Sequence, residues 1–312
     1  MVHLRSYQPD DMETVIRLWN RCLPRDPVTE RIFMRKVLMD PNLDLGGCLV
    51  AENRGQIVGF VLALVRRVPL GALGLQEDTG WISALFVHPD GRRKGIGGQL
   101  MEAALDFLRS RGRRIVWFSS YTPNYFTPGV DLDVHAEAMP FFERYGFEKA
   151  IEVMGMAGSI LDLRIPDGVR TCEERLKDEG ISVQPLEPKY TFVLLSFLET
   201  HFPGDWSLVA WMKLMQGADL DEFLIALSDD GQVVGYAQYE GEHFGPFGVS
   251  EVFRGKGVGS VLFYKTVQQM KAKGYRYIWV AWTHGGAVRF YERAGMRQNR
   301  RHAIMRKVME DV

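Results

Sequence analysis

Apolar side chains recur at helical spacing in two stretches of this chain. In the first stretch they are Leu100, Met101, Ala104, Leu105 and Leu108, and in the second they are Phe263, Val267 and Met270. Residues three or four positions apart share one face of a helix, so both stretches are predicted to be amphipathic helices. A short apolar run that is typical of a strand precedes each helix, "WISALFV" (81–87) in the first case and "FGPFGV" (244–249) in the second.

The rest of the chain repeats one order of predicted elements around these two helices. A strand comes first, then two helices, a hairpin, the apolar run, the amphipathic helix, another strand, a short helix and a closing strand. In the first half these segments are 3–8, 12–23, 29–40, 47–67, 81–87, 100–108, 114–120, 137–146 and 147–157. In the second half they are 181–186, 191–202, 205–217, 223–240, 244–249, 263–270, 277–282, 287–295 and 299–309. The matching order indicates an internal duplication.

The duplication predicts a chain of two domains. We expect a first domain at 1–165, a connecting helix at 166–180 and a second domain at 181–312. The helix is expected at the join because Pro166 suits a helix start and Gly180 suits a helix end.

The two halves differ by one insertion. Equivalent glycines, Gly95 and Gly257, lie 162 residues apart, whereas the short helices near the end of each half are offset by 149. The first half therefore has 13 extra residues, which fall in the Pro-rich and aromatic segment "YTPNYFTPGVDLDVH" (121–135). We predict that this segment is an ordered loop.

Composition narrows the class of protein. The chain has 312 residues, 46% of them hydrophobic, which is enough for about two domains with a core in each. Its 38 Lys and Arg balance its 39 Asp and Glu, which argues against a nucleic-acid partner, and no charge block suggests a membrane-surface tail. The longest apolar runs are too short to span a bilayer. We therefore expect a soluble, cytoplasmic monomer or homodimer.

The cysteines predict neither a disulfide framework nor a metal site. Cys22, Cys48 and Cys172 are scattered, odd in number, and form no C-x-x-C pair. We interpret all three as buried small hydrophobic residues.

Two glycine-rich basic turns stand out between the apolar runs and the amphipathic helices. They are "RRKGIG" (92–97, the first turn) and "RGKGVG" (254–259, the second turn). Helix N-termini carry free amides and a partial positive charge, and glycines let a ligand approach the backbone, so this arrangement suits a phosphate. The P-loop is excluded because no Lys-Ser/Thr pair follows the glycines. The dinucleotide pattern G-x-G-x-x-G is excluded because its last glycine is missing.

The pattern R-x-x-G-x-G after an apolar strand resembles the GNAT superfamily of acyl-CoA-dependent acyltransferases. Two later segments, "AMPFFERYGF" (138–147) and "AVRFYERAGM" (287–296), are similar to the second conserved segment of that family. The resemblance extends over nearly the whole chain, because each half resembles the family separately. It implies an α/β fold of two tandem GNAT-like domains, each with a mixed, mostly antiparallel central sheet flanked by helices.

The same resemblance implies that acetyl-CoA is the cofactor. The turn amides would hold the coenzyme A pyrophosphate, and the end of the preceding strand would hydrogen-bond the pantetheine arm. The implied coenzyme-binding residues are Phe86, Val87, Arg92, Arg93, Lys94, Gly95, Ile96, Gly97 and Gly98 in the first half, and Gly248, Val249, Arg254, Gly255, Lys256, Gly257, Val258, Gly259 and Ser260 in the second.

The two halves differ at the residue that the family commonly uses to protonate the leaving thiolate. Tyr291 occupies this place in the second half, whereas the first half has Phe142, which carries no proton to give. We therefore expect catalysis in the second half and a degenerate site in the first.

The base that accepts the amine proton is less clearly marked. Glu240 is favoured, with Glu242 and His243 as alternatives just before the second strand run. His284 is a candidate for lining the coenzyme cleft, with an exposed loop histidine as the alternative. Trp206, Trp211 and Trp282 could shape an acceptor pocket, although their spacing is more typical of core residues.

These features together favour a tandem N-acetyltransferase that moves an acetyl group to a primary amine of a small molecule. The paired layout is similar to that of mycothiol synthase, in which the second domain is the working one. Two alternatives stay open. The chain could be a non-catalytic acyl-CoA sensor, or it could acetylate a peptide or protein.

Overall fold

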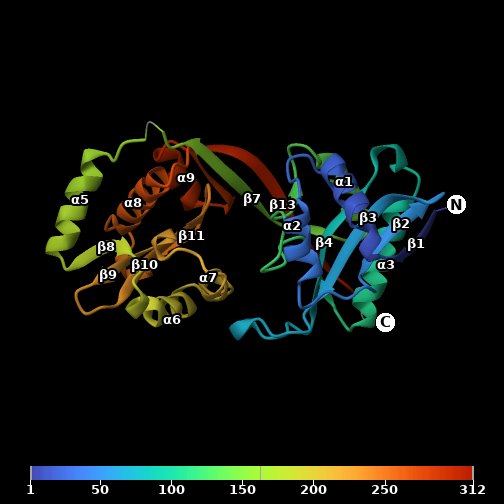
Figure 1. Ribbon diagram of the computed structural model, residues 1–312, viewed down its shortest axis with the longest axis horizontal. Helices are drawn as coiled ribbons and strands as arrows, with labels where there is room; N and C mark the ends of the chain where they lie inside the picture. Colours follow the sequence, from blue (N-terminus) through green and yellow to red (C-terminus); the bar gives the residue numbers. More distant parts are fainter. Residues whose placement is uncertain (1, 162, 311–312) are drawn as a thin grey trace. The chain divides into compact units, whose positions relative to one another are not determined.

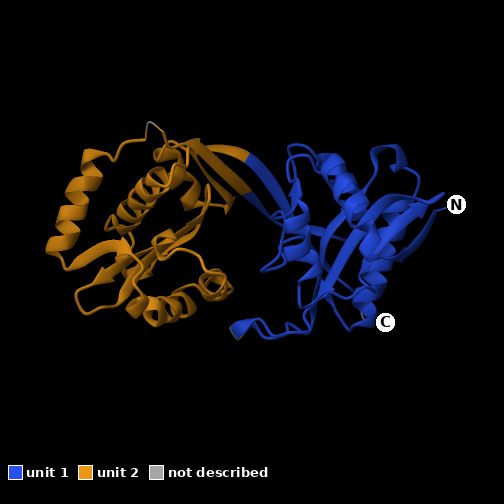
Figure 2. Ribbon diagram, in the orientation of Figure 1, with its two compact units in different colours: residues 1–153, 300–312 blue, residues 154–299 orange. Residues whose placement is uncertain are grey.

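The computed structural model describes residues 2–161 and 163–310, and they form two compact units. Unit 1 contains residues 1–153 and 300–312, and unit 2 contains residues 154–299 (Figure 2). Each unit has a central sheet with helices on both faces, and the elements follow the same order in both (Figure 1). The predicted duplication is therefore confirmed.

Unit 1 is built on five consecutive strands of a mixed sheet. They are β1 (Val2–Ser6), β2 (Cys48–Asn53), β3 (Gln56–Val65), β4 (Thr79–Val87) and β5 (Ile115–Phe118). Neighbouring strands are antiparallel except β4 and β5, which are parallel. The helices are α1 (Met12–Cys22), α2 (Glu30–Phe33) continued by a π-helical turn (Met34–Leu38), α3 (Ile96–Ser110) and α4 (Met139–Arg144).

Both faces of the unit 1 sheet are apolar, because successive side chains of a strand such as β3 point alternately into two cores. Along β3, Val61 and Ala63 pack in the cluster of α3 and α4, whereas Phe60 and Leu62 pack in the cluster of α1 and α2. Successive residues of a strand point to opposite faces, so a continuous apolar run such as β3 is the signature of a sheet covered on both sides.

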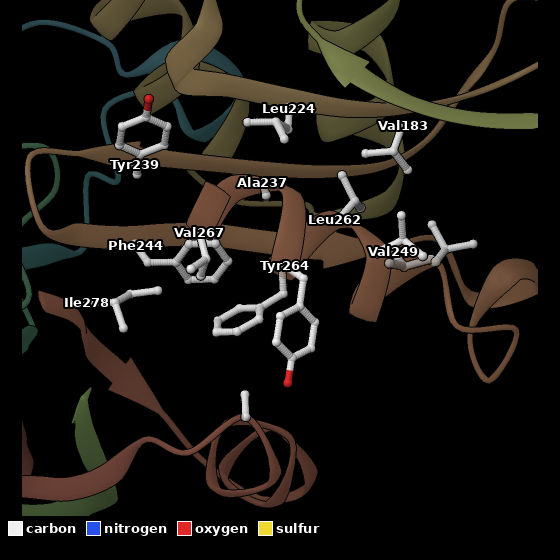
Figure 3. Close-up of a cluster of buried hydrophobic side chains, with 14 of the residues drawn as sticks. Val183, Leu224, Ala237, Tyr239, Phe244, Val249, Leu262, Tyr264, Val267 and Ile278 are labelled. Atoms are coloured by element: carbon white, nitrogen blue, oxygen red, sulfur yellow. The ribbon is translucent and has the colours of Figure 1, made fainter. Parts of the chain in front are cut away.

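Unit 2 repeats this architecture. Its strands are β8 (Ile181–Pro185), β9 (Phe223–Ser228), β10 (Val233–Glu240), β11 (His243–Val249) and β12 (Tyr277–Thr283). Its helices are α5 (Asp167–Asp178), α6 (Thr191–His201), α7 (Trp206–Met215), α8 (Val258–Ala272) and α9 (Gly286–Arg293). One core lies between the sheet and α5, α8 and α9, and includes Leu224, Ala237, Phe244 and Leu262 (Figure 3). The other lies between the sheet and α6 and α7.

Several single 3-10 turns connect these elements. They are Pro9–Asp11, Gly71–Leu73, Pro89–Gly91, Ala136–Ala138, Pro188–Tyr190, Leu220–Glu222 and Glu251–Phe253. No helix among the described residues has the length and the apolar character that crossing a membrane requires.

The closing strands of the two halves are exchanged. β7 (Glu148–Ser159) begins in unit 1, but its residues 154–159 pair with β12 of unit 2. β13 (Arg297–Val308) begins in unit 2, but its residues 305–308 pair with β5 of unit 1. The compact units therefore differ from the contiguous domains expected at 1–165 and 181–312. The alternation of apolar and polar residues in a closing segment predicts that the segment is a strand. It does not indicate which of two similar sheet edges that strand will pair with.

Arg300 anchors the exchanged strand β13 in unit 1. Its Nη atoms donate to both carboxylate oxygens of Asp26 at 2.6 and 2.5 Å, and its Nε and Nη2 donate to Asp131 at 3.1 and 2.8 Å. Asp131 is 4% exposed, and Arg25 also pairs with it at 3.3 Å. The Arg300 guanidinium holds the pKa of this buried carboxyl below its usual value against the opposing effect of burial.

The insertion and the join are ordered, as predicted. Residues Val130–Asp131 of the inserted segment form β6, which pairs with β13. Tyr121 of the same segment is fully buried, with its ring 5.4 Å from that of Trp81. The predicted connecting helix is α5, which begins after Pro166 and is followed by Gly180 at φ +76°.

Candidate functional site

The two glycine-rich turns have nearly the same backbone in the two units. Gly95 and Gly257 are the N-caps of α3 and α8, with φ of +82° and +86°. Two residues earlier the backbone is again left-handed, at Arg93 (φ +60°) and Gly255 (φ +78°). A residue with a side chain costs about 1–2 kcal/mol in the left-handed region. Arg93 therefore carries backbone strain that the second turn avoids by having a glycine at the equivalent position.

The first arginine of each motif ties the turn to the end of its strand. Arg92 Nε donates to the Val87 carbonyl at 3.4 Å, and Arg254 Nε donates to the Val249 carbonyl at 3.2 Å. Both carbonyls belong to the last residue of a strand, β4 in one unit and β11 in the other. These arginines, which the sequence suggested as charges for a phosphate, thus also fix the turn geometry.

The two lysines of the turns are exposed and anchored differently. Lys94 Nζ donates to the Asp90 carbonyl at 2.8 Å. Lys256 Nζ lies 4.9 Å from the centre of the Phe253 ring, in cation–π contact. Both ammonium groups remain beside the start of a helix, where they add positive charge.

The first amides of α3 and α8 lie outside the helical hydrogen-bond ladder. The ladder begins with Gln99 N–H to Gly95 in α3 and with Val261 N–H to Gly257 in α8, both at 3.1 Å. The three preceding amides in each helix belong to Ile96, Gly97 and Gly98, and to Val258, Gly259 and Ser260. Such amides, at the positive end of a fifteen-residue helix, can hold an anion.

Ile96 and Val258 hold these helix starts in place, because both side chains are buried in the core of their unit. In unit 1 the Tyr145 hydroxyl lies close to Gly98 and would contact a side chain there. The equivalent position in unit 2 carries Ser260, so the rims of the two turns differ.

The strands next to each turn separate on the way toward it. Among described residues, the ladder between β11 and β12 consists of the pair His243–Trp279. In unit 1 the pairing of β4 with β5 ends, among the described residues, at Ile82–Phe118, although β4 continues through Phe86 to Val87. Strand edges that separate leave backbone N–H and C=O groups for another partner. The predicted pantetheine positions, including Gly248 and Val249, lie on the separating part.

Tyr291 lies on α9 in an aromatic environment near the start of β11. It is 5% exposed, and its ring centre lies 6.3 Å from that of Phe244, 6.2 Å from Phe263 and 5.4 Å from Phe290. Burial raises the pKa of the Tyr291 hydroxyl above its ordinary value, so the group is protonated at neutral pH.

Phe142 has the equivalent place in unit 1, on α4, and is 4% exposed. Its ring packs against Phe118 at 4.4 Å and Phe147 at 5.7 Å. Both side chains are therefore buried among aromatic rings, but the neighbouring rings come from different positions in the two units, and of the two residues Tyr291 carries the hydroxyl.

The candidate bases lie at the start of β11, at the far end of that strand from the second turn. Glu240 is exposed and stands opposite His243 in the ladder of β10 and β11. Glu242 accepts the backbone N–H groups of Arg276 and Tyr277 at 3.3 and 3.0 Å, which gives it a structural part in starting β12. His284 is exposed after β12.

Trp206 is half-buried against the core of α6 and α7, as the core interpretation expects, whereas Trp211 and Trp282 do not follow it. Trp211 and Trp282 are 47% and 40% exposed. Trp206 stacks on Phe202 with ring centres 4.4 Å apart, and both rings lie over Gly248, where a side chain would collide with them. An aromatic surface therefore covers one face of β11 beside the second turn.

One contact of the second turn was missed by the sequence analysis. Cys172 of α5 is half-buried rather than buried, and its Sγ lies 3.5 Å from the Lys256 carbonyl oxygen. Arg175, one helical turn later, donates from Nη2 to the same oxygen at 2.7 Å. These residues are more than 80 positions away from the turn along the chain. No local pattern signals the contact.

Strand β13 also places a buried imidazole in unit 1. His302 is 1% exposed, and neither ring nitrogen has a hydrogen-bond partner among the described residues. Burial, followed by the charge of Arg300, lowers the pKa of His302 to about 4. The ring is therefore neutral at pH 7.

The family comparison agrees with the tandem fold and the paired turns. The Acetyltransferase (GNAT) family matches residues 12–147 and 193–296, and the chain belongs to this family.

Curated relatives carry the same activity in their names. An acetyltransferase from Pectobacterium atrosepticum is 37% identical over 115 residues, which are 36% of this chain and 70% of the relative. An uncharacterized N-acetyltransferase from Methanocaldococcus jannaschii is 32% identical over 125 residues, which are 36% of this chain and 43% of the relative. The chain is thus an N-acetyltransferase of the GNAT type.

Solved structures share the tandem fold over the whole chain. A GCN5-related glucosamine N-acetyltransferase region of a fungal multi-domain β-N-acetylglucosaminidase has a TM-score of 0.83 at 22% identity and covers 98% of this chain, which spans 38% of that protein. A tandem GNAT protein from the clavulanic acid biosynthesis pathway has a TM-score of 0.65 at 17% identity, with full coverage of both chains. At these identities the likeness concerns the fold.

Proposed function

We propose that this protein transfers an acetyl group from acetyl-CoA directly to a primary amine of a small molecule, and that unit 2 performs the reaction. The observation that carries the proposal is a pair of features at opposite ends of β11. At one end a glycine turn begins a helix, and near the other end lies the buried, protonated Tyr291. The equivalent pairing in unit 1 ends in Phe142.

The donor would bind along β11. The free amides of Val258, Gly259 and Ser260 point into the space before α8 and would hold the pyrophosphate. The separating edge of β11 would pair with the amide groups of the pantetheine arm, which places the thioester toward Phe244. When bound, acetyl-CoA supplies an activated acetyl group.

Two side chains of unit 2 would move protons. Tyr291 holds its proton at neutral pH and lies near the start of β11, where it would protonate the departing sulfur. Glu240, opposite His243 at the same end of the strand, would accept the amine proton directly or through water. The aromatic pair Phe202 and Trp206 lies over Gly248 and would flank the pantetheine arm on its way to the thioester.

The test is thiol release by the purified full chain with acetyl-CoA and a panel of primary amines. The panel includes amino sugars, polyamines, amino acids and peptides. Turnover with a small amine and none with peptides supports the proposal. Turnover with peptides alone favours a peptide or protein acetyltransferase, and coenzyme binding without turnover on any amine favours a sensor.

A further inference from the structure

Helix α5 packs against the back of the second turn. α5 is the segment that joins the two halves of the sequence, and within unit 2 it contacts α8 and β8 (Figure 1). Arg175 Nη2 donates to the Lys256 carbonyl oxygen at 2.7 Å and lies 3.4 Å from Cys172 Sγ. The Arg175 side chain is 49% exposed and is also paired with Glu179 at 2.7 Å, so two contacts fix the guanidinium.

Nothing equivalent stands behind the first turn among the described residues. Apart from the neighbouring residues of the chain and the backbone of α3 itself, no heavy atom there lies within 4 Å of the position that a side chain at Gly95 would take. At Gly257 that position is already filled by Cys172 Sγ. The two turns therefore have a similar backbone conformation but differ in the residues that pack against them.

The contact with Lys256 fixes the direction of one amide. In a planar trans peptide the carbonyl oxygen and the following N–H point in opposite directions. The Lys256–Gly257 peptide is trans, since the cis bonds of the described chain precede Pro123 and Pro246. Because Arg175 holds the Lys256 oxygen toward α5, the Gly257 N–H is turned away from α5 and toward the open side of the turn.

The hydrogen bond also changes the strength of that amide as a donor. A cation that binds the carbonyl oxygen polarises the peptide and makes its N–H a better partner for an anion. The positive charge of Arg175 thus acts on an anion through the peptide, without touching it.

We propose that Arg175 is a positioning residue for the coenzyme pyrophosphate in unit 2. It orients and polarises the Lys256–Gly257 peptide from behind, so that the second coenzyme site depends on the joining helix while the first does not. This inference rests on the proposed function only in taking the second turn as the pyrophosphate site.

The experiment compares Arg175→Ala and Arg175→Lys with Arg170→Ala. Arg170 is an exposed cation on the same helix, five residues earlier, and its loss removes the same charge about 140° around the helix axis. Each variant is assayed with acetyl-CoA and with S-acetylpantetheine, a donor without the pyrophosphate. For Arg175→Ala we expect a five- to tenfold rise in KM for acetyl-CoA with kcat within twofold, and no change with S-acetylpantetheine.

Arg175→Lys should recover part of the loss, because a lysine can still donate to the carbonyl oxygen. Arg170→Ala should behave as the wild type. The inference is overturned if Arg175→Ala matches Arg170→Ala, or if KM rises equally for the two donors, which would indicate a general loss of structure.

Hydrogen exchange keeps the inference testable even if no amine is acetylated. Adding coenzyme A to the wild-type chain should slow amide exchange in peptides from both turns. In Arg175→Ala the protection of residues 254–262 should weaken at a coenzyme concentration that still protects residues 92–100. Equal protection of both turns in this variant would overturn the inference without bearing on whether acetyl transfer occurs.

Discussion

The thiol of Cys172 fills the space into which any side chain at position 257 would project. The equivalent Gly95 in unit 1 faces open space, although both glycines have a left-handed backbone. Gly257 is thus constrained by its backbone and by its neighbour, and Gly95 by its backbone alone. This difference allows the two constraints to be separated by substitution.

Gly95→Ala should cost about 1–2 kcal/mol, the price of an L-residue at a positive φ. Gly257→Ala should cost about 1–3 kcal/mol more, because the new methyl group collides with Cys172. Hydrogen exchange of peptides from α3 and α8 reports the stability of each unit separately. Adding Cys172→Ala should remove the excess at Gly257, and equal costs at the two glycines would contradict the packing argument.

Tyr291→Phe should lower kcat for acetyl transfer by about 10²- to 10⁴-fold, the usual contribution of a positioned proton donor. KM for acetyl-CoA should change little, since the ring and its aromatic contacts remain. Tyr264→Phe is the matched control, because Tyr264 is a buried tyrosine of unit 2 on α8. An equal and small effect of both substitutions would remove Tyr291 from the reaction.

Arg300→Met should destabilise unit 1 by about 3 kcal/mol. The substitution removes the positive charge that pairs with the buried carboxylate of Asp131 and with the carboxylate of Asp26. Exchange of unit 1 peptides should accelerate while unit 2 peptides are unchanged. Arg301→Met is the control, since its pair with Asp133 is partly exposed and is expected to contribute at most about 1 kcal/mol. A similar effect of the two substitutions would contradict an anchoring role for Arg300.

Unit 1 should lose stability as pH falls from 6.5 to 4. The pKa of His302 is lowered from 6.5 to about 4 in the folded protein, so in this window the unfolded chain binds a proton that the folded chain does not. The neutral buried ring therefore costs unit 1 no stability above pH 6.5. By pH 4 it lowers the free energy of unfolding of unit 1 by about 3 kcal/mol. The charged groups around the ring are Arg300, Asp131, Asp26 and Arg25.

The pH dependence can be checked by comparing exchange of unit 1 peptides in wild type and His302→Gln between pH 7 and pH 4.5. The difference between the two proteins should shrink or reverse as the pH falls, since groups that titrate in both cancel. His201→Gln removes an exposed histidine of unit 2 and serves as the control. Parallel profiles for wild type and His302→Gln would contradict the assignment.

The fragment 1–165, which matches the domain expected from the sequence, should fold poorly by itself. It lacks residues 305–308, which pair with β5 in the full chain, and so leaves that edge open. A synthetic peptide of residues 297–310 added to the fragment should restore dispersion in its NMR spectrum. A fragment that gives a dispersed spectrum without the peptide would show that the exchanged strand is dispensable.

The sequence predicts most elements because their signals are local. The apolar run before Gly95 and the helical spacing after it define β4 and α3 between residues 79 and 110, and the same holds for β11 and α8 around Gly257. The difference between Tyr291 and Phe142 is also visible in the sequence, since both stand four residues before a glycine.

The strand exchange and the support of the second turn could not be predicted in this way. β7 and β13 have the same alternation whichever sheet edge they join. Cys172 and Arg175 meet Lys256 through packing of α5 on α8, and nothing in the sequence near any of the three indicates it. The exposure of Trp211 and Trp282 likewise depends on what packs on α7 and β12, and not on their spacing.

The exchange of β13 also reverses the order in which the chain can mature during synthesis. Residues up to 153 leave the ribosome first, yet their sheet is completed only after residues 300–308 have been made. At 5–20 residues per second this is a wait of roughly 7–30 s, during which the edge of β5 is exposed to other chains. The second half of the gene product, made last, is the first that can close its sheet. A nascent chain of this protein is therefore most vulnerable to chaperones and proteases in the part that was translated earliest.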